Sequence, residues 1–239
     1  MILRVEGLSK NFRGLAAIAD VSFAIEAGSI TSIIGPNGAG KSTLFNLVTG
    51  YLAPTAGTIS FQGRPITGLA TNRIAELGIA RAFQIARPFR ELSVLENVRI
   101  GALFGKSGAR DVEATTERAL KLAALADLAD QSASALTVGQ LRHLEVARAI
   151  ATRANLLLAD EPCAGLNPTE TAAMIEVLRK IRTSGVTVVL VEHDMPSVME
   201  VSDRILVLDA GRLIADGAPH DVARDPKVIA AYLGTPEAV

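Results

Sequence analysis

One glycine-rich segment, GPNGAGKST at Gly35–Thr43, restricts the possible folds of this 239-residue chain more than any other feature. It follows the apolar stretch SITSII and precedes LFNLV, which indicates a strand, a tight turn and the start of a helix. The pattern G-x-x-x-x-G-K-[ST] is matched by Gly35, Gly40, Lys41 and Ser42. A chance match in a glycine-rich turn is the alternative, but the flanking strand and helix argue against it. The segment therefore predicts a phosphate-binding loop.

Binding a phosphate chain gives each part of this loop a physical task. Glycine lets the backbone curl so that consecutive N–H groups point at one phosphate chain, and the following helix adds its positive N-terminal end. We expect Lys41 to neutralise charge on the β- and γ-phosphates and the Ser42 hydroxyl to ligate Mg²⁺. The expected nucleotide-binding residues of the loop are Gly35, Pro36, Asn37, Gly38, Ala39, Gly40, Lys41, Ser42 and Thr43.

A second acidic element is needed to hold the metal, and the segment NLLLADEP supplies one. Asp160 and Glu161 follow a short apolar stretch that has the character of a buried strand. Ligands bind at the carboxyl ends of strands in an open parallel sheet. We expect Asp160 to hold Mg²⁺ through water and Glu161 to polarise the attacking water as a general base. The alternative interpretation is a solvated turn or a helix cap.

The order of elements along the chain predicts an α/β fold. Short apolar strands punctuated by glycine fill about the first 85 residues, with one helix after the loop, and strands alternate with helices again from NLLLA onward. Between them, VEATTERALKLAALADLAD and VGQLRHLEVARAIATRA repeat apolar residues at helical spacing, and RILVLDAGRLIADG indicates a hairpin around Ala210 and Gly211. We expect one domain over residues 1–239, with a core at about 1–85 and 155–239 and a helical subdomain at about 86–154.

Composition excludes several classes of protein. Hydrophobic residues make up 49% of the chain, but the apolar runs, such as VTVVLV, have strand length and are too short to span a bilayer. With 24 basic and 25 acidic residues and 4% aromatic residues, nothing favours nucleic acid as a partner. The single cysteine, Cys163, excludes an internal disulfide framework and is typical of a reducing cytosol. We interpret Cys163 as a buried small apolar residue, with a redox sensor as the alternative.

The loop and the acidic strand alone would also fit a kinase, a GTPase or a helicase. Three further stretches narrow the choice of protein class. They are LTVGQLRHLEVAR from Leu136, RAFQ ending at Gln84, and LVEHD with His193. Together with the loop and the acidic strand, these stretches resemble the nucleotide-binding subunit of an ABC transporter over essentially the whole chain. The resemblance implies a P-loop NTPase (RecA-like) core with a helical ABC subdomain and a small antiparallel β region. It also implies ATP and Mg²⁺ as cofactors.

In that family an L-S-G-G-Q element of a second subunit closes over the γ-phosphate. Here the element reads Leu136-Thr137-Val138-Gly139-Gln140, so that Thr137 keeps the hydroxyl and Gly139 and Gln140 are retained, while Val138 replaces the first glycine. The helix that follows would face the phosphate with its N-terminus. The resemblance therefore places Thr137, Gly139 and Gln140 against nucleotide and implies a dimer, of identical chains or with a similar ATPase.

The resemblance assigns further residues one at a time. Gln84 matches the residue that contacts the metal or the attacking water, and His193 matches the switch histidine at the γ-phosphate. Phe12 occupies the place where the family stacks an aromatic ring on adenine, and a simple core or surface phenylalanine is the alternative. Asn167, in AGLN, stands where many relatives have Asp.

A finer resemblance links the chain to the uptake of branched-chain amino acids or a related small polar solute. It rests on RAFQIARPFRELSVLENV, DEPCAGLNPTE, VEHDMPSVMEVSDRILVLDAGRLIADGAP and the terminal VIAAYLG, which includes Gly234. It implies two integral-membrane permease subunits, a periplasmic solute-binding protein and a peripheral position on the cytoplasmic face of the inner membrane. The alternatives are the ATPase of a lipid or polysaccharide exporter and an ATP-dependent regulatory module without transport. The latter is disfavoured because Glu161 and His193 are both present.

A basic segment offers a docking face for a permease. Residues 81–110 contain two acidic residues, Glu91 and Glu96, and six basic ones, Arg81, Arg87, Arg90, Arg99, Lys106 and Arg110. We expect Arg87 to Arg90, with Phe89, to contact a cytoplasmic loop of the permease. A solvated surface is the alternative interpretation.

Overall fold

The computed structural model describes residues 1–106 and 111–233, so Arg110 and Gly234 of the sequence-based expectations lie outside the described residues. The chain forms two compact units. Unit 1 consists of Met1–Thr71 and Leu190–Val239, of which the described part ends at Leu233, and unit 2 is Asn72–Val189. The boundaries of the core and of the helical subdomain expected from the sequence stay a prediction.

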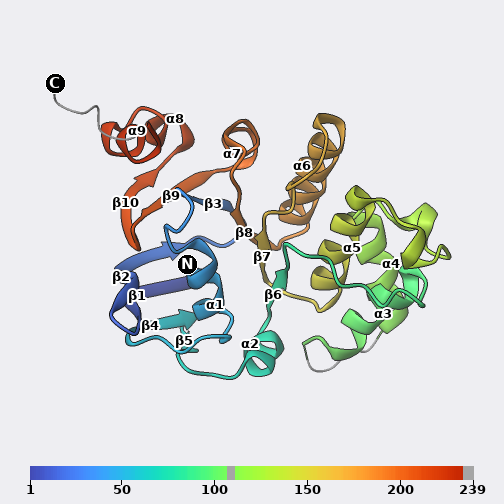
Figure 1. Ribbon diagram of the computed structural model, residues 1–239. Coiled ribbons are helices and arrows are strands. Elements are labelled where there is room, and N and C mark those ends of the chain that lie inside the picture. Colours follow the sequence, from blue (N-terminus) through green and yellow to red (C-terminus); the bar gives the residue numbers. More distant parts are fainter. Residues whose placement is uncertain (107–110, 234–239) are drawn as a thin grey trace. The chain divides into compact units, whose positions relative to one another are not determined.

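Unit 1 contains an antiparallel sheet in the order β2-β1-β4-β5 (Figure 1). Its strands are β1 (Leu3–Phe12), β2 (Leu15–Ile25), β4 (Ala56–Phe61) and β5 (Arg64–Pro65). Buried and exposed side chains alternate at the start of β1, where Leu3 and Val5 are buried and Arg4 is exposed. This alternation is typical of a sheet with one face on the core. The sheet is the small antiparallel region that the family resemblance implies.

A second group of strands in unit 1 leads into the glycine-rich loop. Strand β3 (Ile30–Ile34) pairs in parallel with β9 (Arg204–Asp209), which pairs antiparallel with β10 (Arg212–Gly217). All five residues of β3 are buried, as expected for a parallel strand covered on both faces. The β9–β10 hairpin turns at Ala210 and Gly211, as the sequence predicts.

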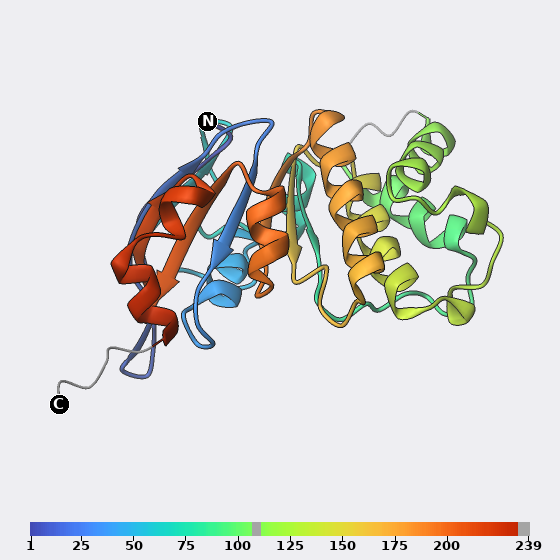
Figure 2. The ribbon, with the colours of Figure 1, turned by 90° about the horizontal axis from the view of Figure 1, so that it is seen from above.

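The helices of unit 1 cover these strands. They are α1 (Lys41–Val48), α7 (Met195–Val201), α8 (Pro219–Val222) and α9 (Pro226–Leu233). Helices α8 and α9 pack against the β9–β10 hairpin (Figure 2). Ile34, the last residue of β3, shares one apolar cluster with Val222 of α8 and Val228 of α9. The C-terminal helices therefore pack around the strand end from which the glycine-rich loop departs.

Unit 2 is mainly helical, with two parallel strands. Its elements are α2 (Thr71–Leu77), which starts at the unit boundary, β6 (Ile79–Ala82), α3 (Val94–Phe104), α4 (Val112–Leu122), α5 (Val138–Ala151), β7 (Leu156–Asp160), α6 (Pro168–Thr183) and two short 3₁₀ turns at Ala126–Leu128 and Ala133–Ala135. Helix α3 packs on both α4 and α5 (Figure 1). The chain returns to unit 1 through β8 (Thr187–Val191).

The helix starts in unit 2 are fixed by side chains. Capping boxes join Ser93 to Glu96, Thr137 to Gln140 and Asn167 to Glu170, so that each N-cap side chain accepts a backbone N–H and each third-position side chain accepts one in return. Each pair satisfies two backbone donors that have no partner inside the helix.

The sequence locates most of these elements and misses a few. The strand at NLLLA, the helix ending before Gly185 and the short helix at MPSVMEVS are confirmed. The helix expected over VEATTERALKLAALADLAD is too long, because it ends at Leu122 and Ala124 adopts a left-handed conformation with φ 55°. The sequence pattern also leaves α2 and β6 unassigned. Strand β6 is missed because four residues are too few to show a pattern. None of the helices in the described part of the chain is both long and apolar enough to cross a membrane.

Candidate nucleotide-binding site

The glycine-rich loop adopts backbone conformations that favour glycine. Gly38 has φ 84°, and Gly40, the residue before α1, has φ 104°. A Cβ atom on Gly40 would lie 2.6 Å from the carbonyl oxygen of Ala17, so the loop approaches strand β2 too closely for a side chain. The carbonyl of Gly40 accepts the first helical hydrogen bond of α1, from the N–H of Leu44 at 2.8 Å. The strand, loop and helix expected from the sequence are all present.

Lys41 lies inside the loop that precedes it. Its side chain is buried, and Nζ donates to the carbonyl oxygens of Gly35 at 2.6 Å and Pro36 at 3.0 Å. The ammonium group thus lies where a loop of this type receives a phosphate chain. Ser42, the next residue, is exposed in the first turn of α1.

The turn between β9 and β10 is hydrogen-bonded to the glycine-rich loop. The N–H of Gly211 donates to the carbonyl of Ala39 at 3.1 Å, and the carbonyl of Gly211 accepts from the N–H of Ala19 at 2.8 Å. Gly211 therefore links the loop to strand β2 through backbone atoms alone. This contact requires glycine, because a Cβ on Gly211 would lie 2.7 Å from the Ala17 carbonyl oxygen.

Asp160 is the last residue of β7, a strand whose five residues are all buried. Its Oδ2 lies 2.5 Å from Nη2 of Arg81, and the two side chains are 7% and 9% exposed. Arg81 comes from β6, which runs parallel to β7 with Arg81 opposite Leu158. Sequence reasoning missed this partner, although an arginine in a short strand three residues before Gln84 was the available signal. A buried carboxylate beside a guanidinium is compensated in charge.

The general-base candidate Glu161 has an unusual backbone. Its φ is 49°, a left-handed conformation that few residues other than glycine adopt and that is concentrated at functional sites. The side chain of Gln84 donates from Nε2 to Oε2 of Glu161. Unit 2 therefore brings together Gln84, Asp160 and Glu161, three residues that the sequence assigns to metal and water.

Thr137, Gly139 and Gln140 form the start of α5. Oγ1 of Thr137 accepts from the N–H of Gln140 at 3.3 Å, and Oε1 of Gln140 accepts from the N–H of Thr137 at 2.9 Å. Gly139 is buried against Glu170, whose Oε1 would lie 2.8 Å from a Cβ at that position. Val138 is 58% exposed, so its side chain projects from the helix start into solvent.

The remaining candidates lie on exposed positions or in turns. His193 is exposed just after β8, and its N–H donates to Oε2 of Glu192 at 3.3 Å. Phe12, at the end of β1, is 42% exposed, with Nζ of Lys10 5.1 Å from the centre of its ring. Cys163 is buried and forms no disulfide, as expected for a small apolar residue.

Comparison with known families gives the assignment. Residues 18–164 match the family model described as ABC transporter, which is more than half of the chain. This chain belongs to the ABC transporter family. Residues 212–238 of the cassette also match the model described as branched-chain amino acid ATP-binding cassette transporter. The family resemblance stated from the loop, the acidic strand and the LTVGQ segment is thereby confirmed.

Three known proteins extend this result. The cassette is 41% identical over 249 residues to the high-affinity branched-chain amino acid transport ATP-binding protein BraF of Pseudomonas aeruginosa, and the match covers 98% of each chain. A crystal structure of an ABC transporter cassette in its ADP conformation superposes with a TM-score of 0.87 at 33% identity and covers 98% of this chain and 99% of that one. A dimeric cassette bound to ADP and Pi gives a TM-score of 0.81 at 26% identity, with coverages of 91% and 99%.

These comparisons confirm the expected P-loop NTPase fold and the ATPase class of this ABC cassette. They leave the roles of the individual side chains as predictions. The cassette also contains contacts next to these candidate residues that its sequence does not reveal, namely the Arg81–Asp160 pair and the hydrogen bonds of Gly211 to Ala39 and Ala19.

Proposed function

We propose that this cassette is the ATP-hydrolysing subunit of a transporter that imports branched-chain amino acids or a related small polar solute. The observation that carries the solute class is the C-terminal match of residues 212–238 to the branched-chain amino acid cassette model. The 41% identity to BraF over 98% of the chain supports it, because that protein is named for the same solutes.

The residues of the cassette suit ATP and Mg²⁺. Mg²⁺ keeps several waters and takes one or two protein oxygen ligands besides the phosphates. The exposed Ser42 hydroxyl offers one such ligand, and the Asp160 carboxylate offers a second through water. In the part of the chain that the structure describes, no cluster of three or more His, Cys, Asp or Glu residues replaces them. Bound Mg²⁺ would neutralise charge on the β- and γ-phosphates.

Hydrolysis requires a base that accepts a proton from water, and we assign it to Glu161. The Gln84 side chain, which donates to the Glu161 carboxylate, orients that base. Lys41 neutralises phosphate charge from inside the loop, His193 contacts the γ-phosphate, and Phe12 stacks on the adenine ring. The exposure of His193 and Phe12 keeps both side chains accessible to a ligand.

A second cassette completes each nucleotide site in this proposal. The start of α5 presents an exposed Thr137 and Val138 to solvent, and a helix N-terminus favours negative charge. The dimeric cassette with ADP and Pi has the same fold. We therefore assign Thr137, Gly139 and Gln140 to the nucleotide of the partner subunit, which is either an identical chain or a similar ATPase.

The transporter would contain two permeases and work with a periplasmic solute-binding protein, with the cassettes at the cytoplasmic face of the membrane. The Arg87–Arg90 segment is suited to contact a permease because its backbone is fixed while the side chains of Arg87, Phe89 and Arg90 are exposed. Glu145 Oε1 accepts the N–H of Arg87 at 3.0 Å, and Arg148 Nη1 donates to the Arg87 carbonyl at 3.0 Å. Asn97 binds the N–H and the carbonyl of Phe89 at 2.8 and 3.0 Å.

Charge reversal tests this docking segment. The double variant Arg87→Glu/Arg90→Glu should abolish transport in cells while the purified cassette keeps its ATPase rate. Arg73→Glu, which reverses an exposed arginine of α2, is the matched control and should transport normally. Normal uptake by the double variant would refute the docking assignment.

The main experiment is affinity purification of the tagged cassette from its native membranes, followed by mass spectrometry. Recovery of two distinct permeases and a second, similar ATPase supports amino acid import. Recovery with a single exporter-type membrane subunit contradicts it. In parallel, Glu161→Gln should bind ATP, fail to hydrolyse it and accumulate as a dimer, whereas hydrolysis at the normal rate would refute the general-base assignment.

A further inference from the structure

The strained backbone at Glu161 is held by the turns that follow it. Glu161 comes directly after β7 with φ 49°, and such a conformation persists only where neighbouring contacts enforce it. The N–H of Ala164 donates to the carbonyl of Glu161 at 3.1 Å, which closes the first turn after the strand. The N–H of Leu166 donates to the carbonyl of Cys163 at 3.1 Å, which closes the next turn. The position of Glu161 therefore depends on the chain segment between β7 and α6.

Helix α5 contacts this segment at two points. Nη2 of Arg142 donates to the carbonyl of Ala164 at 3.3 Å, and this contact is partly buried. One turn earlier on the helix, Gly139 packs against Glu170, whose carboxylate accepts the N–H of Asn167 at 3.0 Å. The first two turns of α5 thus hold both the turn after β7 and the cap of α6.

The stability of the fold gives little reason for an arginine at position 142. Nε of Arg142 is buried and has no hydrogen-bond partner in the part of the chain that the structure describes. Burying an unpaired donor costs free energy, which offsets the gain from the hydrogen bond to Ala164. A buried polar group of this kind in a protein requires an explanation. The contact with the segment that bears Glu161 supplies a functional one.

We propose that Arg142 is a positioning residue for Glu161. Its guanidinium fixes the carbonyl of Ala164, and the N–H of Ala164 fixes the carbonyl of Glu161. The carboxylate of Glu161 is then oriented by the side chain of Gln84, which donates to it. Arg142 itself contacts neither nucleotide nor water in this scheme and acts through the backbone. The inference rests on the proposed role of Glu161 as the general base.

Steady-state ATP hydrolysis by the purified full-length chain tests the proposal. Arg142→Met removes the guanidinium and keeps most of the apolar part of the side chain. We expect kcat to fall about tenfold, because a misplaced base accepts the proton of water less well. KM and the dissociation constant for ATP should change less than about twofold, since the contact acts on the chemical step alone. An unchanged kcat, or a loss of ATP binding in its place, overturns the proposal.

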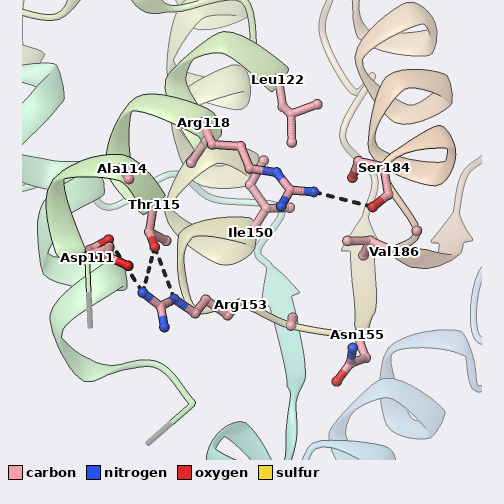
Figure 3. A pocket seen from close by; sticks show the side chains of 13 residues that line it. Asp111, Ala114, Thr115, Arg118, Leu122, Ile150, Arg153, Asn155, Ser184 and Val186 are labelled. Carbon is pink, nitrogen blue, oxygen red and sulfur yellow. Dashed lines mark hydrogen bonds between the residues drawn. The ribbon is translucent and has the colours of Figure 1, made fainter. Parts of the chain in front are cut away.

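Arg118 provides the matched control, because its contact has the same donor atom, the same kind of acceptor and the same distance. Nη2 of Arg118 donates to the carbonyl of Ser184 at 3.3 Å, beside the pocket shown in Figure 3. Asn155, which lines that pocket, precedes β7, whereas Asp160 is the last residue of that strand. Arg118→Met should therefore keep the kcat of the unsubstituted chain. An equal loss of kcat in both variants overturns the assignment, because it would reveal a general effect on unit 2.

Thermal unfolding separates a positioning role from a structural one. Because Nε of Arg142 is buried without a partner, Arg142→Met should shift the unfolding midpoint by less than about 4 °C. A merely structural arginine would lose stability and activity together. A fall in kcat that accompanies a larger fall in the midpoint therefore overturns the positioning role.

The general base and its positioning residue fail separately in this design. Glu161→Gln/Arg142→Met should form the same ATP-dependent dimer as Glu161→Gln, because Thr137 and the start of α5 are unchanged. Loss of that dimer would place the effect of Arg142 at the start of α5 and overturn the proposal. Hydrolysis by Glu161→Gln at the normal rate refutes the general base. A stalled Glu161→Gln together with a fully active Arg142→Met refutes the positioning role alone.

Discussion

Removing the guanidinium of Arg81 tests the buried ion pair at Asp160. Arg81→Met keeps most of the apolar part of the side chain and leaves a 7% exposed carboxylate without its partner at 2.5 Å. Loss of one member of a buried pair costs about 3–5 kcal/mol, because the remaining charge is uncompensated. For a chain of this length, each kcal/mol lowers the unfolding midpoint by about 2–4 °C. We therefore expect the midpoint to fall by roughly 6–20 °C.

The matched control breaks an exposed pair in the same unit. Arg73 and Glu76 on α2 form an ion pair at 2.8 Å with side chains that are 67% and 41% exposed. Exposed pairs contribute about 0–1 kcal/mol, so Arg73→Met should shift the midpoint by less than about 4 °C. Thermal unfolding followed by circular dichroism, without nucleotide, compares the two variants. Equal shifts would refute the argument from burial.

Nucleotide extends the same experiment to the proposed metal role of Asp160. A ligand that binds only the folded state stabilises it in proportion to the logarithm of its concentration over its dissociation constant. With Arg81 replaced by Met, a divalent cation near Asp160 compensates the carboxylate that the guanidinium no longer neutralises. Mg²⁺–ADP should therefore raise the midpoint of Arg81→Met more than that of the unsubstituted chain. Equal gains would argue against Asp160 as a metal-binding residue.

Three other predictions follow from single contacts. Lys41→Met should weaken ATP binding about a hundredfold in equilibrium titration, because it removes the buried ammonium that neutralises phosphate charge. Gly40→Ala should lower the free energy of unfolding by about 1–3 kcal/mol more than Gly38→Ala in urea unfolding, since both have positive φ but only Gly40 lacks space for a Cβ. Partial burial raises the pKa of Tyr232 above 10.0, so its contribution to stability is present below about pH 10 and is lost as pH rises through the folded pKa. Tyr232→Phe should make stability less dependent on pH above about pH 10 in urea unfolding, and an unchanged slope would contradict this.

Local patterns explain what the sequence could predict. The glycine-rich loop can be predicted from the sequence because one contiguous segment contains the strand end, the turn and the helix start, with Gly40 and Lys41 at fixed positions. Asp160 and Glu161 can be predicted as site candidates because they directly follow an apolar run in the sequence. Gly185 correctly marks the end of α6, since it adopts φ 95°. In each case the relevant residues are neighbours in the chain.

Long-range pairing explains what the sequence could not predict. The contact between Arg81 and Asp160 depends on the register of β6 against β7, and a strand of four residues gives too short a pattern to reveal its neighbours. The hydrogen bond between Gly211 and the Ala39 carbonyl likewise joins segments far apart in the chain. The end of α4 was missed because Ala124, a good helix former, adopts a left-handed conformation there.

In the LTVGQ element, the structure explains why valine can replace the glycine of the family pattern. Val138 stands where the family pattern has glycine, yet it is the first residue of α5, an ordinary helical position, and its side chain is 58% exposed. The retained glycine, Gly139, is buried against Glu170, which caps α6 by accepting the N–H of Asn167 at 3.0 Å. A side chain at Gly139 would displace that cap, whereas the side chain of Val138 is more than half exposed to solvent within this chain. The substituted position is therefore the one where the fold itself places no demand for glycine. Any requirement for glycine at Val138 would have to come from the nucleotide or from a second cassette.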